Sequence, residues 1–134
     1  MATYNWGVDR TFIAAQDMDS HQYRFVVTGS IAGECDKAAT AGGSVLGVLQ
    51  NDPRKGEEAA VRIFGFSKVI ANSLTTGSTV AFGQSVKSGS DGMAWGSNTP
   101  VASALSAGMA MEALTTGSGV AIEIFVMPTF GFRA

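Results

Sequence analysis

The run EEAAVRIFGFSKVIA, residues 57–71, decides the fold class of this chain. Its apolar and polar residues alternate, so that Ala59, Val61 and Ile63 share one face of an extended backbone. A period of two over so many positions predicts a β-strand. Gly65 interrupts the run near its middle and indicates a bulge or a bend, because glycine inside a strand commonly marks either one.

The same alternation continues on both sides of this run. It is clearest at residues 120–127, where Ile122 and Ile124 point to one face while Phe125 and Met127 point to the other. Because the second face also carries two large apolar residues, this strand predicts a contact beyond the domain's own core. Further strands are expected at residues 11–15, 22–28, 44–49, 80–86, 93–95 and 108–114.

Turn signals separate these strands. The sequence NDPRKG at residues 51–56 combines Asp, Pro and Gly, each of which favours a reversal for its own conformational reason. Asp91-Gly92 predicts a hairpin between residues 80–86 and 93–95. The sequence LTTGSTVA at residues 74–81 returns as LTTGSGVA at residues 114–121, which predicts two similar corners at Gly77 and Gly117.

Helical periodicity is weak throughout, and the sequence leaves room for one short helix, at residues 102–113 or near 36–41. We therefore predict an all-β, mainly antiparallel fold: a compact, Gly-rich β-barrel or sandwich with at most that one helix. The predicted organisation is an N-terminal arm (residues 1–9), a β domain (residues 10–127) and a C-terminal tail (residues 128–134).

The composition favours a structural role. Charged residues make up 15% of the 134 positions, against about 25% in an ordinary soluble domain. This deficit indicates that part of the surface lies in an interface, although a monomer with a Ser/Thr-rich exterior would also fit. Scattered Lys and Arg residues and a net charge of −2 argue against binding to nucleic acid.

Other features of the chain bear on its compartment. No apolar stretch approaches 18 residues, so we expect no membrane span. The single cysteine, Cys35, excludes an intrachain disulfide and fits synthesis in a reducing cytosol. No signal peptide is recognisable at the start of the sequence.

Candidate chemistry is sparse, and we predict no catalytic, cofactor or metal site. His21 and Cys35 could form a nucleophilic dyad, but a free cysteine is usually a small buried apolar residue. Asp17, Asp19 and His21 alternate and could hold a divalent metal, but a solvated polar turn explains them equally simply. The glycine-rich residues 42–47 lack the Lys of a phosphate-binding loop.

Large apolar residues near the two ends are the candidates for an interface, because aromatic residues are enriched at binding hot spots. The alternative for each of them is ordinary core packing, and the N-terminal pair either folds back on the domain or docks on a partner. The candidates are Tyr4, Trp6, Phe125, Met127, Phe130 and Phe132.

The order of motifs resembles a known family. The sequence GSVLGVLQNDP at residues 43–53 is followed by Gly56-Glu57 and by the run at 61–71 with its central Gly65. Gly77, the Asp91-Gly92 corner and the sequence GSGV at residues 117–120 then lead into the last strand. This arrangement, over roughly residues 30–127, is similar to the small capsid decoration proteins of tailed bacteriophages, also called cement or head-stabilising proteins.

The resemblance implies a protein without enzymatic activity. Members of this family bind the outside of the phage shell after it expands, often as trimers, and clamp neighbouring subunits of the major capsid protein. We accordingly expect a homo-oligomer, in the form of a trimer, on the exterior of the virion capsid after synthesis in the host bacterial cytoplasm. Another virion component, such as a tail-tube or fibre-base subunit, is the alternative, and a small-ligand-binding β-barrel is a more distant one.

Overall fold

The computed structural model describes residues 6–73, 79–96, 105–115 and 117–128. These residues contain strands and turns and no helix, which confirms the predicted all-β class. The strands are β1 (Gly7–Ala14), β2 (Phe25–Thr28), β3 (Glu34–Lys37), β4 (Gly47–Leu49), β5 (Glu58–Asn72), β6 (Ser85–Ser88), β7 (Ala94–Gly96), β8 (Gly108–Ala110) and β9 (Ser118–Val126).

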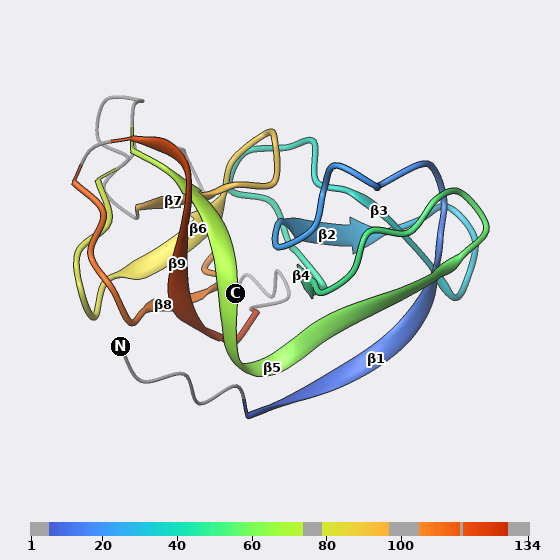
Figure 1. The fold of residues 1–134 in the computed structure, drawn as a ribbon, viewed down its shortest axis with the longest axis horizontal. Coiled ribbons are helices and arrows are strands. Elements are labelled where there is room, and N and C mark those ends of the chain that lie inside the picture. Colours follow the sequence, from blue (N-terminus) through green and yellow to red (C-terminus); the bar gives the residue numbers. More distant parts are fainter. Residues whose placement is uncertain (1–5, 74–78, 97–104, 116, 129–134) are drawn as a thin grey trace, which may run out of the picture.

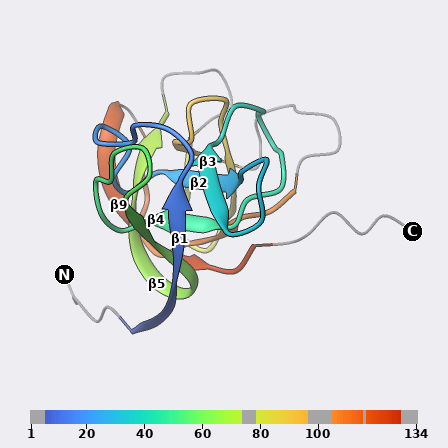
Figure 2. The same cartoon turned by 90° about the vertical axis from the view of Figure 1, so that its right-hand side faces the viewer.

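The long strand β5 organises the sheet because its two halves pair with different partners (Figure 1). Its first half pairs with β1 and β4, and its second half pairs with β9 and β7. The pairing therefore closes twice. A first circuit runs β5-β1-β3-β2-β4 and returns to β5, and a second runs β5-β9-β8-β6-β7 and returns to β5. Figure 2 looks toward the first circuit from its outer end.

Antiparallel pairing dominates this arrangement, as predicted. Among the described strands, only β1–β3 and β5–β7 pair in parallel. The predicted barrel or sandwich thus takes the form of two small closed circuits that have β5 in common.

Gly65 marks the place where β5 passes from one circuit to the other, and Figure 1 shows the strand bending sharply between its two halves. Its φ is +111°, a region that side chains rarely tolerate. A Cβ atom at this position would lie 2.5 Å from the Gly7 Cα and 2.5 Å from the Trp6 carbonyl oxygen. The bend predicted at Gly65 is confirmed, and only glycine fits there without displacing backbone.

Each circuit encloses its own apolar core, and the odd-numbered residues of β5 point into both. Ala59 and Val61 belong to the first core, which also contains Ala14, Met18, Val26, Cys35 and Leu49. Val69 and Ala71 belong to the second, larger core, with Phe25, Ala38, Val45, Val48, Val80, Val86, Ala94, Ala107, Ala110, Leu114, Ile122, Ile124 and Val126.

Strands β2 and β4 lie between the two cores and are buried on both faces. Val26 and Leu49 point into the first core. Their sequence neighbours Phe25 and Val48 point into the second. Because successive strand residues face opposite sides, this pair of strands forms a partition that both cores share.

The predicted turns are present. In the turn before β5, the Arg54 amide donates to the Glu57 carboxylate at 2.7 Å, and Gly56 has a φ of +84°. In the predicted hairpin, β6 pairs antiparallel with β7, and the Met93 amide donates to the Asp91 carboxylate at 3.0 Å. Gly117 has a φ of +116°, as its corner requires, whereas Gly77 lies outside the described residues.

Several predicted boundaries were wrong. Strand β1 begins at Gly7, so residues 7–9, which we assigned to the arm, pair with β5 inside the domain. The strand predicted at 22–28 begins only at Phe25, because Tyr23 has a φ of +62°. The strand predicted at 108–114 stops at Ala110, and Leu114 then forms an isolated bridge with Val80.

Candidate functional site

A chain of four aromatic rings lies on the outer surface at the bend of β5. The Trp6 and Phe64 rings meet edge to face with centroids 6.0 Å apart. Phe125 contacts Phe64 at 5.2 Å and Phe66 at 5.1 Å, again edge to face. This T-shaped geometry is favourable for aromatic pairs, so the four rings hold one another in a fixed arrangement.

The strand register explains why these residues meet. Phe64 and Phe66 flank Gly65 and share the outer face of β5. Val8 is the register partner of Phe64, and Met109 is the register partner of Phe125. Cross-strand partners lie side by side on one face of a sheet. We call the following residues the outer aromatic patch: Trp6, Val8, Phe64, Phe66, Met109, Phe125 and Met127.

Much of this patch is open to solvent. Trp6 and Met127 are each 49% exposed, and Phe64 is 39% exposed. Phe66 and Phe125 are half-buried. Single exposed apolar residues are normal on a soluble protein, but a contiguous group on neighbouring strands marks an interaction site.

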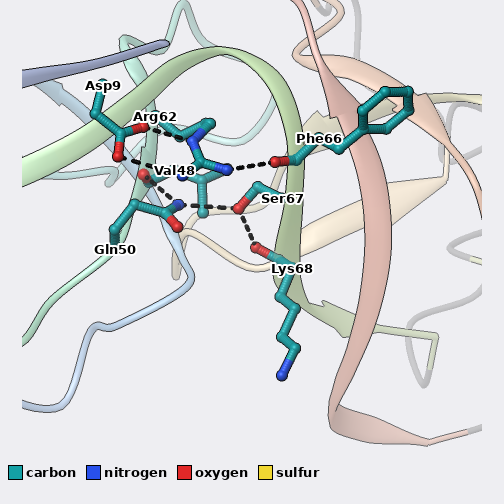
Figure 3. Close-up of polar contacts among 7 residues, drawn as sticks. All are labelled: Asp9, Val48, Gln50, Arg62, Phe66, Ser67 and Lys68. Atoms are coloured by element: carbon teal, nitrogen blue, oxygen red, sulfur yellow. Dashed lines mark hydrogen bonds and ion pairs between the residues drawn. The ribbon is translucent and has the colours of Figure 1, made fainter. Parts of the chain in front are cut away.

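A polar network supports the bend beneath the patch (Figure 3). The Arg62 guanidinium pairs with the Asp9 carboxylate at 2.5 Å and donates to the Phe66 carbonyl oxygen at 2.6 Å. Arg62 can lie across β1 because position 7 is glycine, where a Cβ atom would meet the Arg62 side chain at 2.3 Å. One side chain thus joins β1 to both sides of the bend in β5.

The second part of the network joins β4 to β5. The Gln50 side-chain amide donates to the Ser67 hydroxyl at 2.9 Å and to the Val48 carbonyl at 3.1 Å. Ser67 in turn donates to the Lys68 carbonyl at 2.7 Å (Figure 3). Because Ser67 is buried, these bonds satisfy a polar group that would otherwise destabilise the fold.

The structure links two of the six predicted interface residues, Trp6 and Phe125, through the Phe64 ring. Met127 is exposed one residue after β9 ends, in continuation of the face of Phe125. Tyr4, Phe130 and Phe132 lie outside the described residues. The sequence interpretation missed Val8, Phe64, Phe66 and Met109. For Phe64 and Phe66 a signal was present, because they share a strand face with the charged Arg62 and Lys68.

The candidate dyad has the wrong protonation states for nucleophilic chemistry. Burial and the nearby Asp36 raise the pKa of the Cys35 thiol to about 11, so the thiol stays protonated within the first core. Burial and the cations Arg24 and Lys37 lower the pKa of His21 to about 4. A cysteine nucleophile must be a thiolate, and at Cys35 burial and Asp36 outweigh the backbone hydrogen bond that acts toward that form.

The candidate metal ligands do not converge. The Asp17 carboxylate accepts a hydrogen bond from the Lys55 amide at 2.9 Å, and Asp19 lies 3.9 Å from the Arg54 guanidinium. His21 is buried. Within the described ranges no three His, Cys, Asp or Glu side chains are grouped to hold a metal ion.

The same ranges also contain no helix long and apolar enough to cross a membrane.

This chain resembles known proteins in its fold. No family model and no curated protein matches the sequence. The structure is similar to the crystal structure of the head fiber gp8.5 N base in bacteriophage phi29, with a TM-score of 0.62 and 22% sequence identity. The match covers 90% of this chain and 94% of the other. The two proteins therefore share the fold over nearly their full lengths.

Proposed function

We propose that this protein is a structural component of a phage virion, located on the exterior of the head, and that it acts through protein contacts without catalysis. The observation that carries the proposal is the fold shared over nearly the whole chain with the base of a phage head fiber. The match covers 90% of this chain, so it extends over strands of both circuits.

Two independent features support the proposal. The motif order over residues 30–127 resembles capsid decoration proteins, which also occupy the outside of phage heads. The chain is poor in charge yet presents a contiguous apolar surface, as expected of a subunit built into a larger assembly.

Two versions of this role differ in mechanism. As a decoration protein, the chain would clamp neighbouring capsid subunits in the form of a trimer. Because it would bind only the mature lattice, its binding free energy would stabilise that lattice, and three linked copies would act multivalently. As a fibre base, which the structural neighbour favours, the chain would anchor a longer appendage to the head.

Heads of the encoding phage that lack this protein provide the test. Purified protein added to expanded heads should sediment with them saturably, and it should not sediment with unexpanded ones. In the decoration version, bound protein raises the temperature at which the heads dissociate by several degrees. In the fibre-base version, the protein binds but leaves that temperature unchanged. Absence of binding to expanded heads would contradict both versions.

A further inference from the structure

We propose that the outer aromatic patch is the surface through which copies of this chain associate with one another. The inference rests on the proposed function, because it names the partner that the patch meets within the virion component. It also leaves contact with the head to a different surface of the protein.

The size of the patch suits one side of a protein interface. A large apolar side chain offers roughly 150–250 Å², so the five patch residues that are 39–49% exposed present on the order of 400 Å² of apolar surface. One partner in a standard interface buries about 800 Å². The patch can therefore form the apolar centre of such an interface, with a more polar rim around it.

The charges around the patch make it compatible with its own copy. Asp9 and Arg62 pair with each other at one end. At the other end, Lys68 and Glu123 are opposite one another in the register of β5 and β9. The Glu112 carboxylate also lies at this end, where it accepts a hydrogen bond from the Glu123 amide at 2.9 Å. A rim of one sign would repel an identical rim, whereas this one carries both signs at each end. The patch itself contains no charged residue.

The chain ends also favour a second copy as the occupant. Trp6 and Met127 belong to the patch, and the chain continues from them into residues 1–5 and 128–134. Segments of this length can span at most roughly 17–25 Å. The predicted interface residues Tyr4, Phe130 and Phe132 belong to these two segments, within that chain length of Trp6 and Met127.

The last argument for a second copy is that other copies of the chain are present as soon as the protein is made. An exposed apolar patch of several hundred Å² on a soluble protein is commonly a contact site for another protein. Other copies of the same chain are the partner that is present from the start. Three copies arranged about one axis would close the assembly and cover every patch.

The test is the mass of the purified full-length protein by light scattering, for the wild type and for two patch variants, Phe64→Asp and Met127→Asp. Phe82→Asp and Ile31→Asp are the matched controls, since these residues are 72% and 65% exposed and lie outside the patch. We expect a discrete oligomer for the wild type and the controls. Both patch variants should have the 13.8 kDa mass of the monomer, with the circular dichroism spectrum of the folded protein retained.

Met127 follows the end of β9, so its substitution tests the patch even if Phe64→Asp fails to fold. A monomeric wild type would overturn the inference, and so would a Met127→Asp variant that keeps the wild-type mass. A wild type that is monomeric until residues 129–134 are deleted would show that the chain's own tail covers the patch, which also overturns it.

Binding to expanded heads, measured in parallel, separates this inference from the proposed function. If patch variants stay oligomeric but no longer bind heads, the patch contacts the head, and the inference fails while the function stands. If the patch variants become monomeric while the wild-type oligomer binds no head, the inference stands and the proposed function fails.

Discussion

The two circuits of strands share β5 but close in different ways. The first closes through a long antiparallel ladder of β1 on β5, together with two register pairs between β4 and β5. The second has an equally long ladder of β9 on β5, but its other closure, between β5 and β7, rests on the single pair of Ala71 and Ala94. The circuit with fewer register pairs at this closure is also the one that encloses the larger core.

This difference teaches that neither circuit is an independent unit. Phe25 and Val48 lie on strands of the first circuit, yet their side chains fill the core of the second. The first circuit therefore supplies part of the apolar core of the second circuit, whose closure between β5 and β7 rests on a single register pair. We expect the two circuits to fold and unfold together.

The coupling between the two circuits should be most sensitive to a substitution at Gly65, where β5 bends from one circuit into the other. Gly65→Ala should destabilise the fold by at least about 4 kcal/mol, because unfavourable φ is combined with a clash against backbone. Gly83→Ala is the matched control, with a φ of +79° and no atom within 4 Å of an added Cβ. It should cost about 1–2 kcal/mol. Urea unfolding measures both, and equal losses would show that the bend is not a fixed joint.

Truncation of one large side chain in each core tests the coupling between the circuits with a smaller loss of stability than Gly65→Ala. Leu49→Ala in the first core and Ile124→Ala in the second should each cost about 2–5 kcal/mol, because both residues are fully buried. Unfolding followed by fluorescence and by circular dichroism should give one coincident transition for each variant. Hydrogen exchange at Val61 and Val69 then reports the two circuits separately. Loss of protection at only one of them would contradict the coupling.

The smallest expected effect concerns His21, which packs between the circuits. Its Nε2 lies 2.8 Å from the position of a Cβ placed on Gly92 in the β6–β7 hairpin, and it has no hydrogen-bond partner among the described residues. Burial, with Arg24 and Lys37 nearby, lowers its pKa to about 4 in the folded protein, against 6.5 for an ordinary histidine, while Asp91 acts weakly in the opposite direction.

Because the folded pKa is the lower one, the unfolded chain binds the extra proton between pH 6.5 and pH 4. Stability should thus be unaffected by this group above pH 6.5 and fall as the pH drops toward 4, by on the order of 2 kcal/mol at pH 5. Urea unfolding of the wild type and of His21→Gln at pH 7.5 and pH 5 measures the difference. An equal loss in both proteins would show that His21 is not responsible.

The fold class and the position of the bend in β5 follow from the amino-acid sequence alone. Alternation over residues 57–71 and 120–127 requires strands, since only an extended chain separates those residues into two faces. Gly65 within the run, and the Asp and Gly residues of the turns, fixed where the chain bends and reverses. These are local properties of the backbone, which neighbouring residues dictate.

Only the tertiary structure decided which faces are buried and which residues meet. Phe64 and Phe125 are far apart in the sequence, and their contact depends on the register between β5 and β9. Phe25 and Val26 are adjacent, yet they fill different cores because β2 lies between two circuits. Register and closure are set by long-range pairing, and no local pattern encodes that pairing. The outer aromatic patch is therefore a property of the fold, although each of its residues was visible in the sequence.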